Sequence, residues 1–331
     1  MTSPTSMDLL FADARTRAGG GAWREVCTLL GPREAELAAD SEMVVLYGEA
    51  LMRTGEERRA RDWLRAAEPR LVQNDERAAH RRAVNMLGAA CLALGELEAA
   101  AQSFGRALEL ATQADDLLVL ARATNNLGAI ANLQGDRERA LWHYRLAVPT
   151  FQRLGQQRGL AASFHNMAIT FRDQGQLDEA DEHERRAIEY ATDGDVPRLA
   201  AMGRVGRAEI ALRRGDARLA EATARIATEE FARLGDLLNE GDAWRLTGAS
   251  CAAQQRHDEA FAAFDRALAI AGEHGHALTE AETLRDRMEV RVRTGARDLA
   301  RDDAAAALAI FVMLGAQAEC DALRERMEAL G

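Results

Sequence analysis

Residues 117–155 read LLVLARATNNLGAIANLQGDRERALWHYRLAVPTFQRLG, and this stretch decides the fold. Two apolar faces with helical spacing lie on either side of Gly135, and they indicate a pair of helices. Gly135 and Gly155 end these helices, because glycine tolerates the left-handed backbone conformation that closes a helix. We predict two antiparallel helices of roughly 17 residues each, joined by a short turn. The faces consist of Leu120, Thr124, Leu127 and Ile130, and of Ala140, Tyr144, Ala147 and Phe151.

The glycine that separates the two helices recurs on a grid of 40 residues, with Gln255 in its place in one repeat. Alanine stands five and twelve residues after this position in all seven repeats, and fourteen matches in one register exceed what composition explains. Repetition at this period indicates a stack of similar helix pairs. The rows are Gly55, Gly95, Gly135, Gly175, Gly215 and Gly295; Ala60, Ala100, Ala140, Ala180, Ala220, Ala260 and Ala300; and Ala67, Ala107, Ala147, Ala187, Ala227, Ala267 and Ala307.

A further row of small residues, seven positions before the glycine grid, predicts where the two helices of each pair cross most closely. A large side chain stands between the two alanines in most repeats. Glu184, Ala224 and Ala304 replace it in three repeats, so we expect looser or different packing there. The small row is Gly48, Gly88, Gly128, Ala168, Ala208 and Gly248, with Met288 as the exception, and the large residues are Leu64, Phe104, Tyr144 and Phe264. A row of helix stops closes the repeats at Asp75, Asp115, Gly155, Asp195, Gly235, Gly275 and Gly315.

These rows resemble the tetratricopeptide repeat (TPR). The 40-residue form, with stretches such as NNLG at 125–128 and RLG at 153–155, is similar to the arrays of kinesin light chains, of the LGN/Pins adaptors and of bacterial regulators. The resemblance implies an all-α fold, a right-handed α-solenoid of stacked antiparallel helix pairs. It covers residues 41–315 as seven units in one continuous array, with a degenerate helix pair or cap at 1–40 and a capping helix at 316–331.

The charge balance argues against nucleic acid and membrane as partners. The 42 basic residues, all of them arginine, and the 53 acidic residues leave a net charge of −11, whereas binding to DNA or to an anionic membrane starts from excess positive charge. No signal peptide is visible and no apolar run approaches the roughly 20 residues of a membrane-spanning helix, so we expect a cytoplasmic location. The four cysteines form no CxxC pair and predict small buried thiols.

Motifs that would indicate catalysis are not found in the sequence. The lack of lysine excludes a P-loop and enzymes that form a Schiff base on a protein lysine. His183 and Glu184 begin the zinc-binding pattern HExxH, but Ala187 stands where the second histidine belongs. We therefore expect no enzyme activity, no metal and no cofactor.

The predicted binding surface is the inner face of the array, which the TPR resemblance assigns to six positions around the small-residue row. In the second to fourth repeats these positions hold mainly asparagine and arginine. An asparagine amide donates and accepts at once, as an extended peptide backbone requires, and arginine offers a bidentate fork to a carboxylate. Exposed asparagine is also a poor helix former, so helix propensity does not explain the row. The predicted peptide- or partner-binding residues are Arg82, Asn85, Arg122, Asn125, Asn126, Asn132, His165, Asn166 and Arg172.

Two alternatives accompany this prediction. Asn125 and Asn126 could instead brace neighbouring helices. The fifth to seventh repeats mix both charges on their inner positions, which favours a solvated face whose residues pair with one another over a second partner site. Those positions hold Glu209, Arg213, Asp242, Arg245, Glu282, Arg285, Asp286, Glu289 and Arg293.

The sequence thus predicts a non-enzymatic adaptor that binds a peptide or partner helix, expected to be an acidic or C-terminal segment, in its concave groove. The alternative function is a regulatory sensor, which binds a signalling peptide or partner and changes its superhelix shape to control a transcription or signalling pathway. Self-association into a homo-oligomer also remains open.

Overall fold

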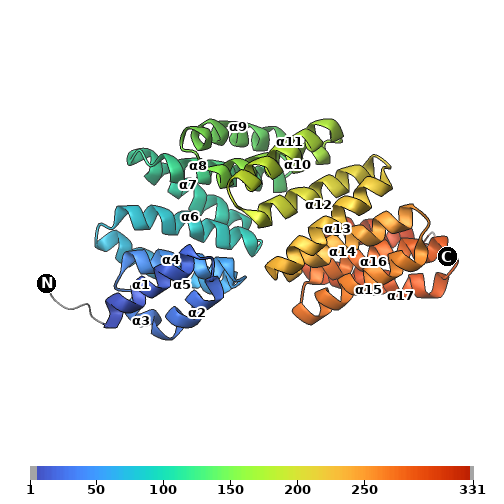
Figure 1. The fold of residues 1–331 in the computed structure, drawn as a ribbon, viewed down its shortest axis with the longest axis horizontal. Coiled ribbons are helices and arrows are strands. Elements are labelled where there is room, and N and C mark those ends of the chain that lie inside the picture. The colour runs from blue at the N-terminus through green and yellow to red at the C-terminus, as the bar shows by residue number, and fades with distance from the viewer. Residues whose placement is uncertain (1–5, 329–331) are drawn as a thin grey trace. The chain divides into compact units, whose positions relative to one another are not determined.

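The computed structural model describes residues 6–328, and all of their regular secondary structure is helical (Figure 1). The chain divides at the end of the third repeat into two compact units, residues 1–155 and 156–331. Residues 1–5 of the predicted N-terminal cap and 329–331 of the predicted capping helix lie outside the described residues. The first unit consists of α1 (Ser6–Gly19), α2 (Trp23–Leu30), the short 3-10 helix η1 (Gly31–Arg33), α3 (Glu34–Leu37), α4 (Ser41–Arg53), α5 (Glu57–Gln73), α6 (Arg77–Ala93), α7 (Leu97–Gln113), α8 (Leu117–Leu133) and α9 (Arg137–Arg153). The second consists of α10 (Gln157–Asp173), α11 (Leu177–Asp193), α12 (Pro197–Arg213), α13 (Ala217–Leu234), α14 (Leu237–Ala253), α15 (His257–His274), α16 (Ala277–Arg293), α17 (Arg297–Leu314) and α18 (Gln317–Glu328).

Helix length accounts for the 40-residue period. The helices α6 and α7 have 17 residues each, and turns of three residues follow them at 94–96 and 114–116. Two such helices with their turns make one repeat, as the sequence predicted. The turns contain the left-handed residues expected from the two rows of helix stops. Asp115 has φ +55° and Gln255 has φ +64°, so these residues adopt the conformation that glycine provides in other repeats.

The small-residue row lies where the helices of a pair are closest, as predicted. A Cβ atom at Gly128 would lie 2.6 Å from the ring of Tyr144, and one at Gly248 would lie 2.6 Å from the ring of Phe264. These distances are too short for any real side chain, so glycine is required wherever an aromatic ring faces the row.

Where a repeat departs from the row of small residues and the row of large residues, a larger side chain in one row accompanies a smaller side chain in the other. Met288 stands in the small row and pairs with Ala304 in the large row, and both are fully buried in one cluster. Ala208 and Ala224 likewise share a cluster with Leu246. The packing in these two repeats is therefore different, as one of the two predicted alternatives stated, because a larger residue on one helix fills the space that a smaller one leaves on the other.

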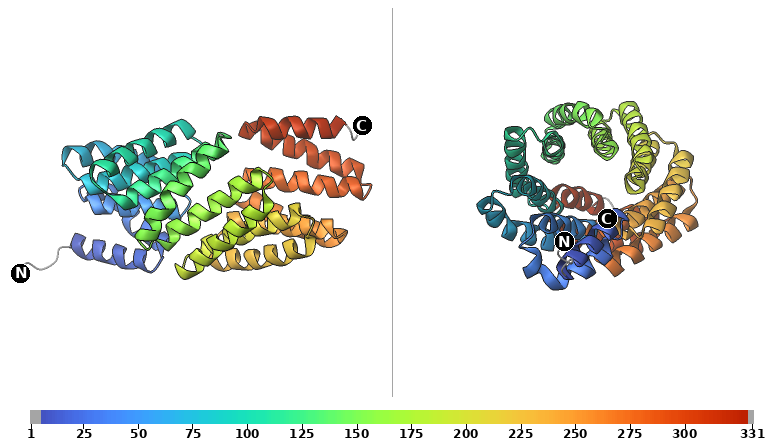
Figure 2. Two further views of the ribbon diagram at one scale, coloured as in Figure 1. Left: turned by 90° about the horizontal axis from the view of Figure 1, so that it is seen from above. Right: turned by 60° about the vertical axis from the view of Figure 1, so that its left-hand side comes forward.

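Helices stack within each unit in the same way. Consecutive helices pack against each other, and the first helices of successive repeats also make contact, in the series α4, α6, α8 and in the series α10, α12, α14, α16. The stacked helices α14–α17, in orange to red, can be followed in Figure 2. The first helices thus form one continuous layer in each unit. The last helix, α18, buries Cys320 and Leu323 against the cluster of α16 and α17.

Candidate functional site

The predicted inner face of the first unit carries three arginines on successive first helices. Arg53 of α4 forms an ion pair of 3.0 Å with Glu49, and Arg82 of α6 pairs with Glu42. The guanidinium groups of these two residues are therefore already engaged by carboxylates of the same unit.

Arg122 of α8 differs from its two neighbours. Its side chain is exposed, and no carboxylate among the described residues lies within ion-pair distance of it. Neighbouring protein atoms displace part of the water around the guanidinium group, and this loss of hydration lowers the pKa of Arg122. The carboxylates of Glu49 and Asp116 oppose this shift at longer range. Arg122 thus offers an unoccupied bidentate fork on the inner face.

Three of the four predicted asparagines of this unit are half-buried, namely Asn85, Asn126 and Asn132. The side-chain oxygens of Asn85 and Asn132 are shielded from solvent and accept no hydrogen bond, which is uncommon for buried polar atoms and leaves their hydrogen-bonding capacity unused. Asn125 was predicted on the inner face, but the structure corrects this position. Its side chain is only 6% exposed, so it does not line an accessible face.

In the second unit, His165 of α10 is held by an interior carboxylate. Its Nδ1 lies 3.0 Å from both carboxylate oxygens of Glu184 on α11, and Glu184 is 1% exposed. Burial opposes the charged form of His165, but the Glu184 carboxylate outweighs this effect and raises the pKa of His165. Burial also raises the pKa of Glu184, against the influence of His165. His165 was predicted to face a ligand, yet its ring is engaged within the protein.

Gly206 of α12 explains how a carboxylate fits at a position that is aromatic in other repeats. A Cβ atom at Gly206 would lie 2.1 Å from Oε1 of Glu184, so the missing side chain leaves room for the carboxylate. The sequence showed that Glu184 breaks the row of large residues. It did not show that a histidine on the paired helix and a glycine on the next one compensate for it.

The other two predicted residues of α10 lie near the inner layer of the second unit. Asn166 is half-buried. Arg172 forms an ion pair with Glu209 of α12 and contacts Asp173 at 3.2 Å, so its fork is occupied. The nine predicted binding residues thus fall into different classes, and Arg122 is the one arginine among them that lacks a carboxylate among the described residues.

A cavity of about 700 Å³ opens on the inner layer of the second unit, between α10, α12, α14 and α16. Arg245 of α14 lines the cavity with a side chain 12% exposed, and it pairs with Asp286 at 2.9 Å and with Glu282 at 3.4 Å. The carboxylates around it keep Arg245 charged despite its burial, and they raise its pKa. The favoured interpretation of these repeats as a solvated face is therefore wrong at Arg245. The sequence showed which charges are present but not that the layer is hollow.

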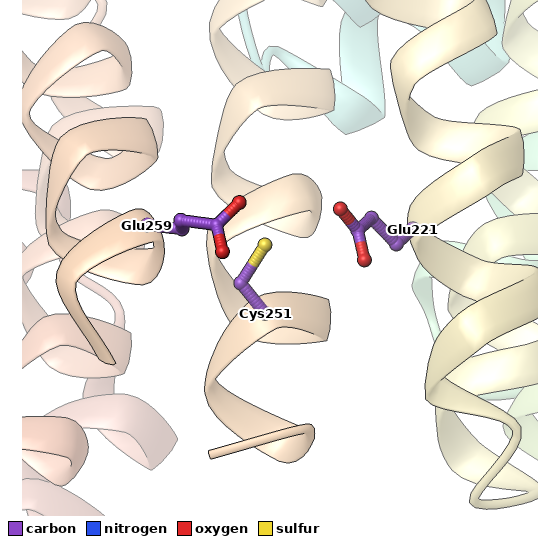
Figure 3. A group of neighbouring side chains, drawn as sticks. All are labelled: Glu221, Cys251 and Glu259. Carbon is purple, nitrogen blue, oxygen red and sulfur yellow. The ribbon is translucent and has the colours of Figure 1, made fainter. Parts of the chain in front are cut away.

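A second group of interest lies on the same unit, where Glu221 of α13, Cys251 of α14 and Glu259 of α15 converge (Figure 3). Their potential ligand atoms lie within 4.8 Å of one another, and Cys251 is fully buried. Arg256, however, donates to Glu221 at 2.5 Å and also to Glu259. Burial opposes ionisation of Glu221, but hydrogen bonds from Gln254, Arg225 and Arg256 lower its pKa to about 2. Arginine therefore holds the place that a cation would take.

The same arrangement occurs in the first unit with its charges reversed. Arg61 pairs with Glu96 beside the buried Cys91, and these positions precede Glu221, Arg256 and Cys251 by 160 residues, or four repeats. Burial raises the pKa of Cys91 and also that of Cys251, with the neighbouring glutamate adding to each shift. An ion pair that recurs with either polarity serves to connect successive repeats, so we interpret the Glu221 group as structural.

The arrangement of the helices indicates the class of protein. Stacked antiparallel helix pairs of constant length, with one layer formed by the first helices, are typical of a helical-repeat protein of the α-solenoid type. Within residues 6–328, no helix combines the length and the apolar character that crossing a bilayer requires.

Comparison with known families identifies the repeat. Residues 119–193 and 82–113 match two models of the tetratricopeptide repeat. These residues of the chain are tetratricopeptide repeats. A comparison with curated protein sequences gave no match.

Solved structures of the same fold resemble it over nearly its whole length at low sequence identity. A Rap protein in complex with competence and sporulation factor aligns with a TM-score of 0.67 at 13% identity, over 97% of this chain and 96% of the Rap chain. The apo quorum sensor NprR from B. thuringiensis aligns at 0.58 and 13%, over 98% of both chains. A signal transduction ATPase with a tetratricopeptide repeat sensor, from Pyrococcus horikoshii, aligns at 0.63 and 14%, over 98% of this chain and 52% of the ATPase. At this identity the likeness establishes the fold.

Proposed function

We propose that this protein is a non-enzymatic interaction module that binds a peptide or partner segment on the inner face of its first unit. The observation that carries the proposal is Arg122, an exposed arginine that has no carboxylate partner among residues 6–328, on a face where Arg53 and Arg82 are both paired. A free guanidinium of this kind favours an acidic side chain or a C-terminal carboxylate.

The surroundings of Arg122 suit an extended peptide. Asn85, Asn126 and Asn132 are each half-buried, so part of each side chain is accessible. Leu133, at the end of the same helix as Arg122, is 62% exposed and supplies an apolar contact. Charge, amide groups and an apolar side chain on one face are the elements that a peptide-binding surface combines.

The experiment is a pull-down from the native lysate, with the wild type beside the double variant Arg122→Ala/Asn126→Ala. Asn125 is left unchanged, because replacing a buried side chain would confuse binding with folding. The matched control is Arg145→Ala/Gln152→Ala, two exposed residues of α9 outside the inner layer. A partner that the wild type and the control retain and the inner-face variant loses supports the proposal.

The identified partner is then reduced to the segment that binds and is titrated against the same three proteins. We expect its affinity to fall as salt rises, because an exposed charge pair is screened. If the inner-face variant binds the segment as tightly as the wild type, the proposed groove is wrong.

A regulatory sensor is the second candidate. It is favoured by the similar structures, which include a quorum sensor, a protein with a tetratricopeptide repeat sensor and a Rap protein in complex with competence and sporulation factor. In this version the bound segment changes the shape of the protein. X-ray scattering with and without the segment separates the two functions, since an unchanged radius of gyration contradicts the sensor and leaves the adaptor in place.

A further inference from the structure

The cavity of the second unit has walls of mixed charge whose acids are all neutralised. Asp286 and Glu282 pair with Arg245, and Glu209 pairs with Arg172. Glu289 accepts two hydrogen bonds from Arg326 of α18, at 2.7 and 2.8 Å. A ligand that enters the cavity therefore meets no unpaired carboxylate on these walls.

Two arginines of the cavity lack such a partner. Arg213 donates to the backbone carbonyl of Arg172 at 3.2 Å, and Arg293 donates to the carbonyl of Glu289 at 3.2 Å. Both side chains are exposed, and within the described part of the chain neither lies within ion-pair distance of a carboxylate. The excess charge that the cavity presents is positive, in a chain whose net charge is −11.

The two arginines have the same register on alternate first helices. Arg213 is the last residue of α12 and Arg293 the last residue of α16, and Ala253 holds the equivalent position on α14 between them. Ala253 is exposed, and Ala249 one turn earlier is half-buried. Small apolar side chains therefore line the cavity between the two arginines.

We propose that this cavity is a second binding site, for an acidic peptide segment whose two carboxylates engage Arg213 and Arg293. An apolar side chain between the carboxylates packs over Ala249 and Ala253. The volume of about 700 Å³ is in the range of sites that hold small ligands and short segments. This site is distinct from the one proposed in residues 1–155, and either can fail without the other.

The test measures the binding of defined peptides by isothermal titration calorimetry. The probes are blocked peptides in which two aspartates are separated by two to six residues including a leucine, with the same peptides carrying asparagine in place of aspartate for comparison. We expect one aspartate spacing to bind best and the asparagine peptides to bind at least about tenfold more weakly, as expected when hydrogen bonds to charged groups are lost. Inorganic phosphate is tested as a competitor, to separate a peptide site from a site for any small anion.

Three variants test the residues. Arg213→Ala and Arg293→Ala should each lower the affinity about tenfold. Ala253→Asp should also weaken binding, because its carboxylate would lie on the cavity wall between the two arginines and repel the carboxylates of the peptide. Aspartate is compatible with this register, since Asp173 is the last residue of α10. The matched control is Arg233→Ala, an exposed arginine of α13 that also donates only to the carbonyl four residues earlier, at 3.2 Å, and lies outside the cavity.

The outcomes decide the proposal. It is supported if the three cavity variants lose affinity while their circular dichroism and the binding of the Arg233→Ala control stay unchanged. It is overturned if the wild type binds no aspartate peptide, if the cavity variants bind like the wild type, or if phosphate at equal concentration displaces the peptide. Substitutions at Arg122 should leave this binding unaffected, so failure of the first proposal is distinguishable from failure of this one.

Discussion

The Nδ1 atom of His165 lies 3.0 Å from the carboxylate of Glu184 in the interior of the second unit, at a position where other repeats place an aromatic ring. The pair replaces apolar packing by a buried interaction between two titratable groups. Arg172 and Glu209 are the other charged residues whose fields reach both members. Stability of this repeat should therefore depend on pH and on both partners being present.

Removing the histidine should destabilise the protein more than neutralising the acid. His165→Ala leaves Glu184 buried without a partner, and we expect a loss of about 3–5 kcal/mol in the free energy of unfolding. Glu184→Gln keeps a hydrogen-bond acceptor and should cost less. Chemical denaturation of both variants measures the difference, and equal losses would argue against a coupled pair.

The same pair sets a pH dependence. The pKa of His165 and the pKa of Glu184 are both raised on folding, so the folded pair holds more protons than the unfolded chain above the ordinary histidine pKa of about 6.5. The stability that the proton on His165 contributes is therefore fully present below that pH and is lost as the pH rises through the folded pKa of His165. Melting temperatures of the wild type should fall as the pH rises above about 6.5, more steeply than those of Glu184→Gln. Parallel curves would show that the pair makes no such contribution.

The complementarity of the two packing rows predicts a rescue. Gly248→Ala should cost about 1–3 kcal/mol, because its Cβ atom would meet the ring of Phe264. The double variant Gly248→Met/Phe264→Ala reproduces the Met288 and Ala304 arrangement and should be more stable than Phe264→Ala alone. Thermal unfolding compares these proteins.

The control for this series is Gly272→Ala on α15, where the added Cβ has nothing within 4 Å. Alanine is a better helix former than glycine, so this variant should gain about 0.5–1 kcal/mol. A loss at Gly272 similar to that at Gly248 would mean that the crossing distance is not the cause.

The turn that contains Gln255 can be made more stable by substitution. It adopts φ +64° at a position that is glycine in the other six repeats, and its side chain is exposed. A left-handed conformation costs an ordinary residue roughly 1–2 kcal/mol, and glycine regains part of this at an entropic cost of its own. Gln255→Gly should thus raise the melting temperature, and Gly295→Gln should lower it. Failure of the two substitutions to act in opposite directions contradicts this explanation.

The Glu221, Cys251 and Glu259 group predicts a specific response to zinc. In the wild type Arg256 occupies both carboxylates, so zinc should not raise the melting temperature through this group. Arg256→Ala removes the arginine that donates to both carboxylates and leaves the contacts of Arg225 and Gln254 with Glu221, which zinc can displace. Zinc should then stabilise the variant by binding the folded state. The effect should disappear in Arg256→Ala/Cys251→Ser. Stabilisation of the wild type by zinc that depends on Cys251 would show that the arginine does not block the site.

The sequence alone determined the helix pairs, their period and their closest crossings, because these depend on contacts within one repeat. The glycine opposite Tyr144 and the left-handed conformation of Asp115 both follow from local steric limits. Such limits are visible in the sequence as particular residue types at fixed spacing. The place of Arg122 on the inner face stays a prediction of the same kind, because it rests on the register of one helix.

Only the tertiary structure decided how residues of different repeats satisfy one another. The burial of Asn125, the pairing of His165 with Glu184 and the space left by Gly206 all depend on three-dimensional proximity between neighbouring helices. The same is true of the cavity around Arg245 and of the arginines that remain unpaired there. Ion pairs, hydrogen bonds and cavities depend on which residues are neighbours in the folded protein. The sequence pattern shows which residues could take part, but not which of them come into contact.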